Sequence, residues 1–113
     1  MPDPHVFTVL APGEETPSDV VPFATVAEEE GLTLVVPAEA GATGPLWARI
    51  SLTIHSDLEA VGLTAAFAGA LANRGLPANV IAGFHHDHLF VPWERRHEAL
   101  AVLLALAGRH AHV

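Results

Sequence analysis

The sequence predicts an α+β fold in which two helices cover one face of an antiparallel sheet. Apolar and polar side chains alternate along residues 47–55, which is typical of a strand with one buried face. Residues 56–74 and 93–108 instead repeat their apolar side chains at helical spacing. Two short apolar runs, 78–84 and 88–92, separate the two helical segments and read as strands. The predicted order is therefore strand, helix, strand, strand, helix.

The N-terminal part is predicted to consist of strands alone. Residues 5–10 are rich in β-branched and aromatic side chains, and a loop with two prolines, a glycine and three acids follows over 11–19. The apolar runs 23–27 and 32–36 are separated by three glutamates and Gly31, which predicts a hairpin. Strands and hairpin thus occupy 5–37, and the small residues of 38–45 form a linker.

The strand over 47–55 is predicted to bury Ala48, Ile50, Leu52 and Ile54 and to present Arg49, Ser51 and Thr53 on its other face. The helix that follows should begin at Ser56, because Ser56 and Glu59 have the spacing of a capping box. Its predicted buried face is Leu58, Val61, Ala65, Ala68 and Leu71. Gly75 suits the left-handed residue after the helix, and Pro77 prevents continuation.

The last elements are a hairpin and a second helix. His85 to Asp87 are predicted to form the turn between the two strands. The helix should bury Leu100, Leu103 and Ala107 and end at Gly108, before a flexible tail of residues 109–113. The core over 47–108 is then a ferredoxin-like βαββα unit that lacks its last strand, which the N-terminal strands must supply or extend. We expect residues 1–113 to form a single domain.

Composition excludes several classes of function. The 113 residues contain no cysteine, which rules out disulfides and favours the cytoplasm. There is no lysine, so Schiff-base chemistry and a phosphate-binding P-loop lysine are excluded. A formal charge of −8 makes nucleic acid and anionic membranes poor partners. The longest apolar run is too short to span a bilayer, and we expect no signal peptide.

The segment His85-His86-Asp87-His88 admits a metal site as an alternative. Imidazoles bind Zn²⁺ or Ni²⁺, and His85, His86 and His88 lie within four positions. In an extended strand His86 and His88 point to one side and His85 and Asp87 to the other, so the segment offers two ligands at a time. His55 could add a third. A polar hairpin without metal explains the same pattern.

Catalysis is not predicted. Ser56 with His55 or His86 and an acid has the composition of a catalytic triad. The chain nevertheless lacks the G-x-S-x-G pattern, and Ser56 already has a capping role. We therefore expect a protein that is not an enzyme and that needs no cofactor.

Three segments resemble the ACT domain family. They are similar, in chain order, to segments of a bacterial group of stand-alone ACT proteins without assigned function. The three segments are "EEEGLTLVVP", "LTIHSDLEAVGLTAAFAGAL" and "NVIAGFHHDHLFVPWE". The ACT units of the cytosolic arginine sensors of animals are more distantly similar. The resemblance implies a ferredoxin-like fold that binds an amino acid or related metabolite between two domains. The implied site positions are His55, Ser56, Asp57, Leu58, Glu59, Val61 and Gly62 on the first loop, and Phe84, His86, Asp87 and His88 on the hairpin.

An amino acid would find complementary groups at these two places. The N–H groups at a helix N-terminus suit its carboxylate, and Asp87 suits its ammonium group. The alternatives are that Ser56 and Glu59 only cap the helix and that Asp87 is only a turn residue. Open sheet edges favour a homodimer. Besides metabolite binding and metal binding, the third possible function is that of a protein-interaction domain without a ligand.

Overall fold

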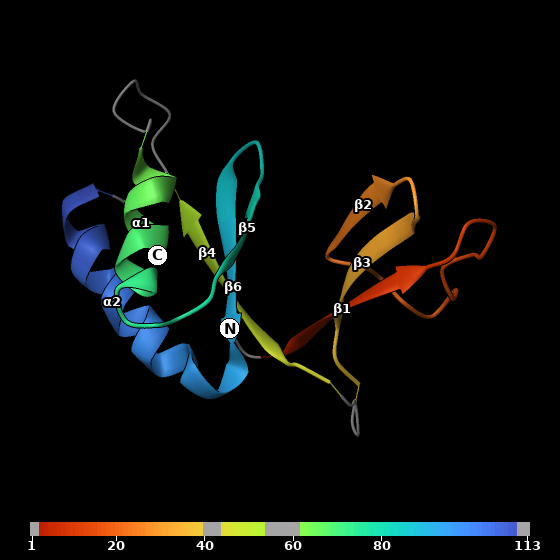
Figure 1. Ribbon diagram of the computed structural model, residues 1–113, viewed down its shortest axis with the longest axis horizontal. Coiled ribbons are helices and arrows are strands. Elements are labelled where there is room, and N and C mark those ends of the chain that lie inside the picture. The colour runs from red at the N-terminus through yellow and green to blue at the C-terminus, as the bar shows by residue number, and fades with distance from the viewer. Residues whose placement is uncertain (1–2, 40–43, 54–61, 111–113) are drawn as a thin grey trace. The chain divides into compact units, whose positions relative to one another are not determined.

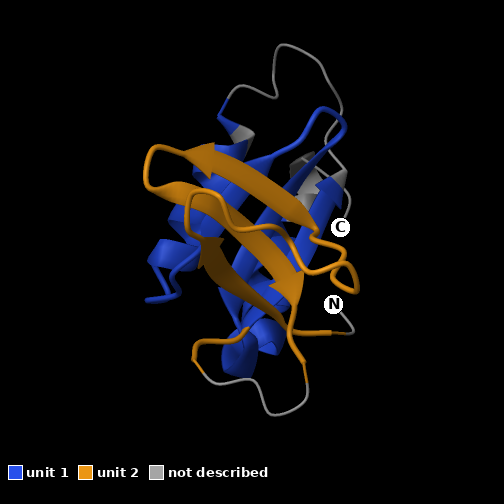
Figure 2. Cartoon of the chain, turned by 90° about the vertical axis from the view of Figure 1, so that its right-hand side faces the viewer, with its two compact units in different colours: residues 1, 47–113 blue, residues 2–46 orange. Residues whose placement is uncertain are grey.

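The computed structural model describes residues 3–39, 44–53 and 62–110, which belong to two compact units. Residues 2–46 form the N-terminal unit, and residues from 47 onward form the C-terminal unit (Figure 2). The division falls directly after the predicted linker 38–45.

The N-terminal unit is a three-stranded antiparallel sheet (Figure 1). Its strands are β1 (His5–Leu10), β2 (Ala24–Glu28) and β3 (Gly31–Pro37), and β3 pairs with both of the others. The predicted strand over 5–10 and the predicted hairpin are confirmed. Glu28 lies opposite Gly31, so the hairpin loop contains only two residues.

Gly31 allows β1 and β3 to pair next to this tight loop. Leu10 lies opposite Leu32, so the end of β1 runs directly beside Gly31. Gly31 has a φ of 153°, and a β-carbon there would overlap the carbonyl oxygen of Leu10. Only glycine fits this backbone conformation without displacing the neighbouring strand.

The C-terminal unit contains an antiparallel sheet and two helices, as predicted. Its elements in chain order are β4 (Trp47–Thr53), α1 (Leu63–Ala72), β5 (Asn79–Ala82), β6 (His86–Pro92), a 3₁₀ turn (Trp93–Arg95) and α2 (Arg96–His110). Strand β6 is central, with β4 and β5 paired antiparallel on either side. None of the helices within 62–110 is long and apolar enough to cross a membrane.

One hydrophobic core joins this sheet to both helices. The predicted buried face of β4 is confirmed for Ala48, Ile50 and Leu52, which are buried in the core, while Ile54 lies outside the described residues. The other fully buried members are Phe67 and Leu71 of α1, Leu76, Leu89 and Val91 of β6, and Ala99 and Leu103 of α2. Every second residue of β4 therefore packs against the same cluster as the helices.

The predicted start and buried face of the first helix need correction. Helix α1 begins at Leu63, and its N-cap residue Gly62 is left-handed with a φ of 97°. A left-handed residue breaks the helical phase, so spacing counted forward from Ser56 cannot continue through it. Ala65 is exposed and Phe67 is buried instead, whereas the predicted burial of Leu71 is confirmed. Residues 54–61, with the predicted capping box, lie outside the described residues.

The end of α1 follows the prediction. Gly75 is left-handed with a φ of 69°, and the N–H group of Leu76 donates to the carbonyl of Leu71. Arg95 then closes this end of the helix, because its guanidinium donates to the carbonyls of Arg74 and Gly75 and pairs with Glu98 of α2. A cation at a helix C-terminus is favourable on electrostatic grounds as well.

Two further boundaries differ from the prediction. His86 and Asp87 belong to β6 rather than to the turn, because the N–H group of Gly83 donates to the carbonyl of His86 and closes the turn earlier. Helix α2 continues through Gly108 to His110. Glycine within a helix costs about 1 kcal/mol, which weakens a helix without ending it. Residues 111–113 of the predicted tail lie outside the described part of the chain.

Candidate functional site

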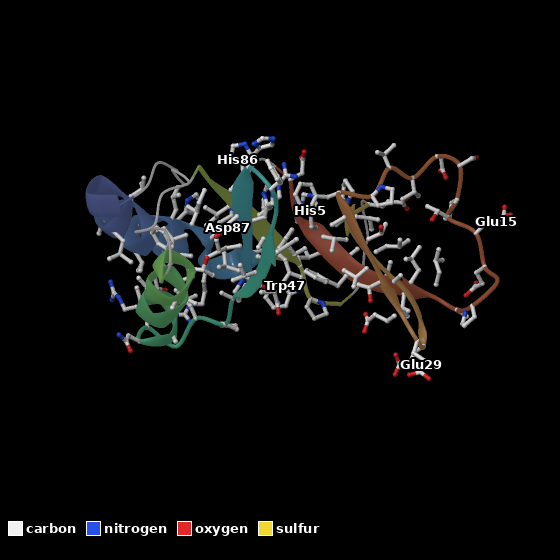
Figure 3. All side chains as sticks on the ribbon, turned by 90° about the horizontal axis from the view of Figure 1, so that it is seen from above. His5, Glu15, Glu29, Trp47, His86 and Asp87 are labelled. Atoms are coloured by element: carbon white, nitrogen blue, oxygen red, sulfur yellow. The ribbon has the colours of Figure 1, made fainter. Side chains whose placement is uncertain are left out.

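Asp87 lies against the first turn of α1. In the sheet it stands opposite Leu52 of β4, whose side chain is in the core, so Asp87 shares the helix-facing side of β6. Its Oδ2 accepts a hydrogen bond of 2.7 Å from Oγ1 of Thr64, the second residue of α1. Figure 3 shows Asp87 on the α1 side of β6. The start of the first helix and the β5–β6 hairpin are therefore in direct contact.

The N-terminus of α1 carries a partial positive charge that its own side chains leave uncompensated. Gly62 makes no side-chain capping bond, and the first turn of α1 contains no acidic residue. The exposed N–H groups of a helix start attract anions. Asp87 adds a half-buried carboxylate beside them, and the Thr64 bond leaves its Oδ1 able to accept another hydrogen bond. This pair of groups can hold a ligand with both an anionic and a cationic end.

His86 and His88 lie on the opposite face of β6 from Asp87. They stand opposite Thr53 and Ser51 of β4, which confirms the predicted alternation along the segment. The hydroxyl of Ser51 and Nδ1 of His88 are 2.7 Å apart and form a cross-strand hydrogen bond. The predicted cluster is thus divided between the two faces of the sheet.

The environment of His88 favours its neutral form. Partial burial holds the pKa of His88 below its ordinary value of 6.5, and the positive charges of Arg49 and His86 act in the same direction. The negative charge of Asp87 raises the pKa of His88, but this effect is weaker than the others. A neutral imidazole keeps one donor and one acceptor, which suits the hydrogen bond to Ser51.

This lowered pKa predicts a pH dependence of stability. Below pH 6.5 the unfolded chain binds a proton at His88 more readily than the folded protein does, so the free energy of unfolding should fall as the pH drops. Urea unfolding at pH 7.5 and 5.5 should show a smaller loss in His88→Gln than in the wild type. The exposed His97, changed to glutamine, is the control and should retain the wild-type loss. An unchanged loss in His88→Gln would contradict this prediction.

The other predicted site residues are distributed as follows. Gly62 is the N-cap of α1, and Phe84 is 97% exposed at the hairpin, where its ring contacts that of His85 edge-on. The predicted loop residues His55, Ser56, Asp57, Leu58, Glu59 and Val61 lie outside the described residues. Thr64 and the pairing of Ser51 with His88 were not predicted from the sequence. Both depend on how distant elements align, which no local pattern specifies.

The described hairpin residues do not by themselves form a metal site. The rings of His86 and His88 have centroids 6.2 Å apart, and that of His85 lies 6.4 Å from His86. Within 3–39, 44–53 and 62–110, no three side chains of the usual ligand types come close enough to hold a metal ion. Stoichiometric metal in untagged protein, lost in His86→Ala/His88→Ala, would be needed to support that alternative.

A separate hollow of about 340 Å³ lies wholly within the N-terminal unit. It is lined by Asp19, Val20, Val21, Pro37, Ala38 and Glu39. None of the predicted site residues that the structure describes is among these, and Val21 is 81% exposed, so the hollow is shallow. It offers two carboxylates but no described cationic group.

Comparison with known proteins gives two family matches and a structural relative. Residues 43–105 match one family model described as an ACT domain, and residues 1–44 match a second model with the same description. The structure is similar to a crystal structure of a protein of unknown function from Vibrio cholerae, described as a possible transport protein. The two share 49% identity and a TM-score of 0.77, over 91% of this chain and 82% of the other. No curated protein matches the chain.

Proposed function

Since the chain belongs to the ACT domain family, we propose that it binds a small metabolite, an amino acid in the first instance, and acts through this binding without catalysis. ACT domains generally bind small-molecule ligands in regulation. The observation that carries the proposal is the hydrogen bond between Thr64 and Asp87, which brings a carboxylate to the start of α1.

The proposed ligand is held at both ends. Its carboxylate accepts hydrogen bonds from the first-turn N–H groups of α1, and its ammonium group pairs with Asp87. The first loop, from His55 to Gly62, and Phe84 of the hairpin remain the proposed surroundings. His86 and His88 lie on the other face of β6 from Asp87, so we propose that they contact a ligand held by a second protomer. A zwitterion matches this arrangement better than a simple anion, because a carboxylate so close to an anion would repel it.

The proposal extends to the architecture and assembly. Residues 47–108 form the ferredoxin-like βαββα core with both helices on one sheet face, because β4 and both helices contribute to one core cluster. With the strands of 5–37 it makes one ACT-like domain in a cytoplasmic protein. Strand β5 pairs only with β6 among the described strands, and an open edge of this kind favours a homodimer with ligand between protomers.

Thermal unfolding with a panel of amino acids tests the ligand. A ligand at about 100 times its Kd should stabilise the protein by about 2.7 kcal/mol. We expect Asp87→Asn, which keeps the shape and removes the charge, to abolish this shift. Glu94→Gln is the matched control, because Glu94 is an exposed carboxylate of the same unit, and it should respond like the wild type.

Two outcomes would contradict the proposal. One is the absence of any shift across the amino acids and related metabolites. The other is a shift that Asp87→Asn retains in full, which would mean that the ligand binds elsewhere. A protein captured by the chain in the absence of any small-molecule response would instead favour the interaction domain.

A further inference from the structure

The hydroxyl of Thr64 connects the start of α1 to the sheet. Thr64 is the second residue of the helix, and its Oγ1 donates to Oδ2 of Asp87 at 2.7 Å, across 23 positions of the chain. Both residues are half-buried. Because a hydroxyl has a single hydrogen, the oxygen of Thr64 keeps only its capacity to accept once this bond is made.

The bond leaves two hydrogen-bond acceptors next to each other. Oγ1 of Thr64 has given its hydrogen to Oδ2, and an ionised carboxylate has none to give. Oδ1 of Asp87 is bonded to the same carbon as Oδ2, so it also lies near Oγ1 of Thr64. One nitrogen at a distance of about 2.9 Å from each oxygen can bridge the two. The pair therefore suits a group that has at least two N–H donors.

We propose that Thr64 determines the specificity of the ligand site: its Oγ1 accepts a second hydrogen bond from the ammonium group that Asp87 holds, so the site selects a primary ammonium. This inference rests on the proposed function. A primary ammonium group has three N–H donors and can satisfy both oxygens at once. A trimethylated ammonium group has the same charge and no N–H donor. Hydrogen bonds from a charged donor are the stronger kind, so their loss separates the two ligands.

The position of the pair at the start of α1 makes hydrogen bonding, rather than charge, the basis of this selection. The helix N-terminus has a partial positive charge, and no acidic residue in the first turn offsets it. This charge opposes any cation and weakens the attraction of Asp87 for it. Partial burial strengthens the hydrogen bonds that replace those to water. The two bonds to Thr64 and Asp87 then decide which cation binds.

NMR titration of the ¹⁵N-labelled protein with glycine, and separately with glycine betaine, tests the selection. Glycine betaine is the N,N,N-trimethyl form of glycine, and neither probe has a side chain, so the two differ only at the nitrogen. We expect saturable shifts of the backbone amides of Thr64 and Asp87 with glycine. The affinity for glycine should exceed that for glycine betaine about tenfold or more. The same spectra show whether each variant is folded.

Thr64→Val removes the hydroxyl and keeps the size of the side chain. It should lower the affinity for glycine about tenfold and leave the affinity for glycine betaine unchanged, because glycine betaine has no N–H group for Oγ1 to accept. A mere disturbance of the local structure would weaken both probes alike. Thr64→Ser keeps the hydroxyl and should restore the preference. Thr25→Val is the matched control: Thr25 is an exposed threonine of β2 in the other unit, and this variant should keep the wild-type preference.

Four results would overturn the inference: no saturable shift with glycine, equal affinities of the wild type for the two probes, a preference that Thr64→Val leaves unchanged, or a failure of Thr64→Ser to restore it. Asp87→Asn separates the inference from the proposed function. A glycine response that Asp87→Asn abolishes and Thr64→Val leaves intact would remove the role of Thr64 and keep the proposed site. The absence of a glycine response together with the absence of a thermal shift from any amino acid would refute both.

Discussion

Replacement of Gly31 by valine is expected to destabilise the N-terminal sheet by about 3–5 kcal/mol. The new β-carbon would overlap the carbonyl oxygen of Leu10, which belongs to the backbone of β1 and cannot rotate away. Relief requires β1 and β3 to separate just where Leu10 pairs with Leu32. Since folded domains are stable by only about 5–15 kcal/mol, this loss should make transient opening of the sheet much more frequent.

Hydrogen exchange of the backbone amides of β1 and β3 measures this effect directly. Gly31→Val should accelerate exchange in both strands by at least a hundredfold, because a loss of 1.4 kcal/mol corresponds to a factor of ten. Gly13→Ala is the control: Gly13 is also left-handed, with a φ of 89°, but no atom lies within 4 Å of the site of its β-carbon. It should cost only about 1 kcal/mol. Equal effects of the two substitutions would show that the overlap with Leu10 is unimportant.

The parts of the fold that could be predicted are those set by residues close together in the sequence. Alternation over Ala48, Ile50 and Leu52 identified β4 and its buried face, because a strand repeats every two residues. Gly31 and the adjacent glutamates identified the β2–β3 hairpin, since a tight loop needs that chemistry. Gly75 likewise marked the end of α1 through its left-handed conformation.

The parts that were not predictable depend on conformation or on distant pairing. Gly62 shifts the start of α1 by adopting a left-handed conformation. The neighbouring residue types do not distinguish a left-handed glycine from a helical one. The buried position of Phe67 in place of Ala65 follows from that shift.

The candidate site shows the same division. Alternation along β6 correctly placed His86 and His88 on one side and Asp87 on the other. The hydrogen-bond partners of Asp87 and His88 could not be predicted from the sequence, because the bonds Thr64–Asp87 and Ser51–His88 span 23 and 37 positions. A sequence identifies which groups can react or bind, whereas the strand register decides which of them meet.

The adjacent residues Leu103 and Leu104 of α2 provide the second large prediction. Leu103 is fully buried in the core with Phe67 and Leu71, whereas Leu104 is 52% exposed. Leu103→Ala removes the same atoms as Leu104→Ala but leaves a cavity. We expect it to cost about 3–5 kcal/mol, against less than about 1 kcal/mol for its neighbour. Urea unfolding followed by tryptophan fluorescence measures both values.

This comparison isolates burial from every other consequence of the substitution. The two variants share the helix, the residue types and the gain in helix propensity from leucine to alanine, so these contributions cancel in the difference. Both tryptophans, Trp47 and Trp93, belong to the C-terminal unit, and Trp93 packs against the same core, so the fluorescence reports the relevant transition. Similar losses in the two variants would mean that α2 does not bury the face containing Leu103. The core around Leu103 would then not be what holds α1 against the sheet beside Asp87.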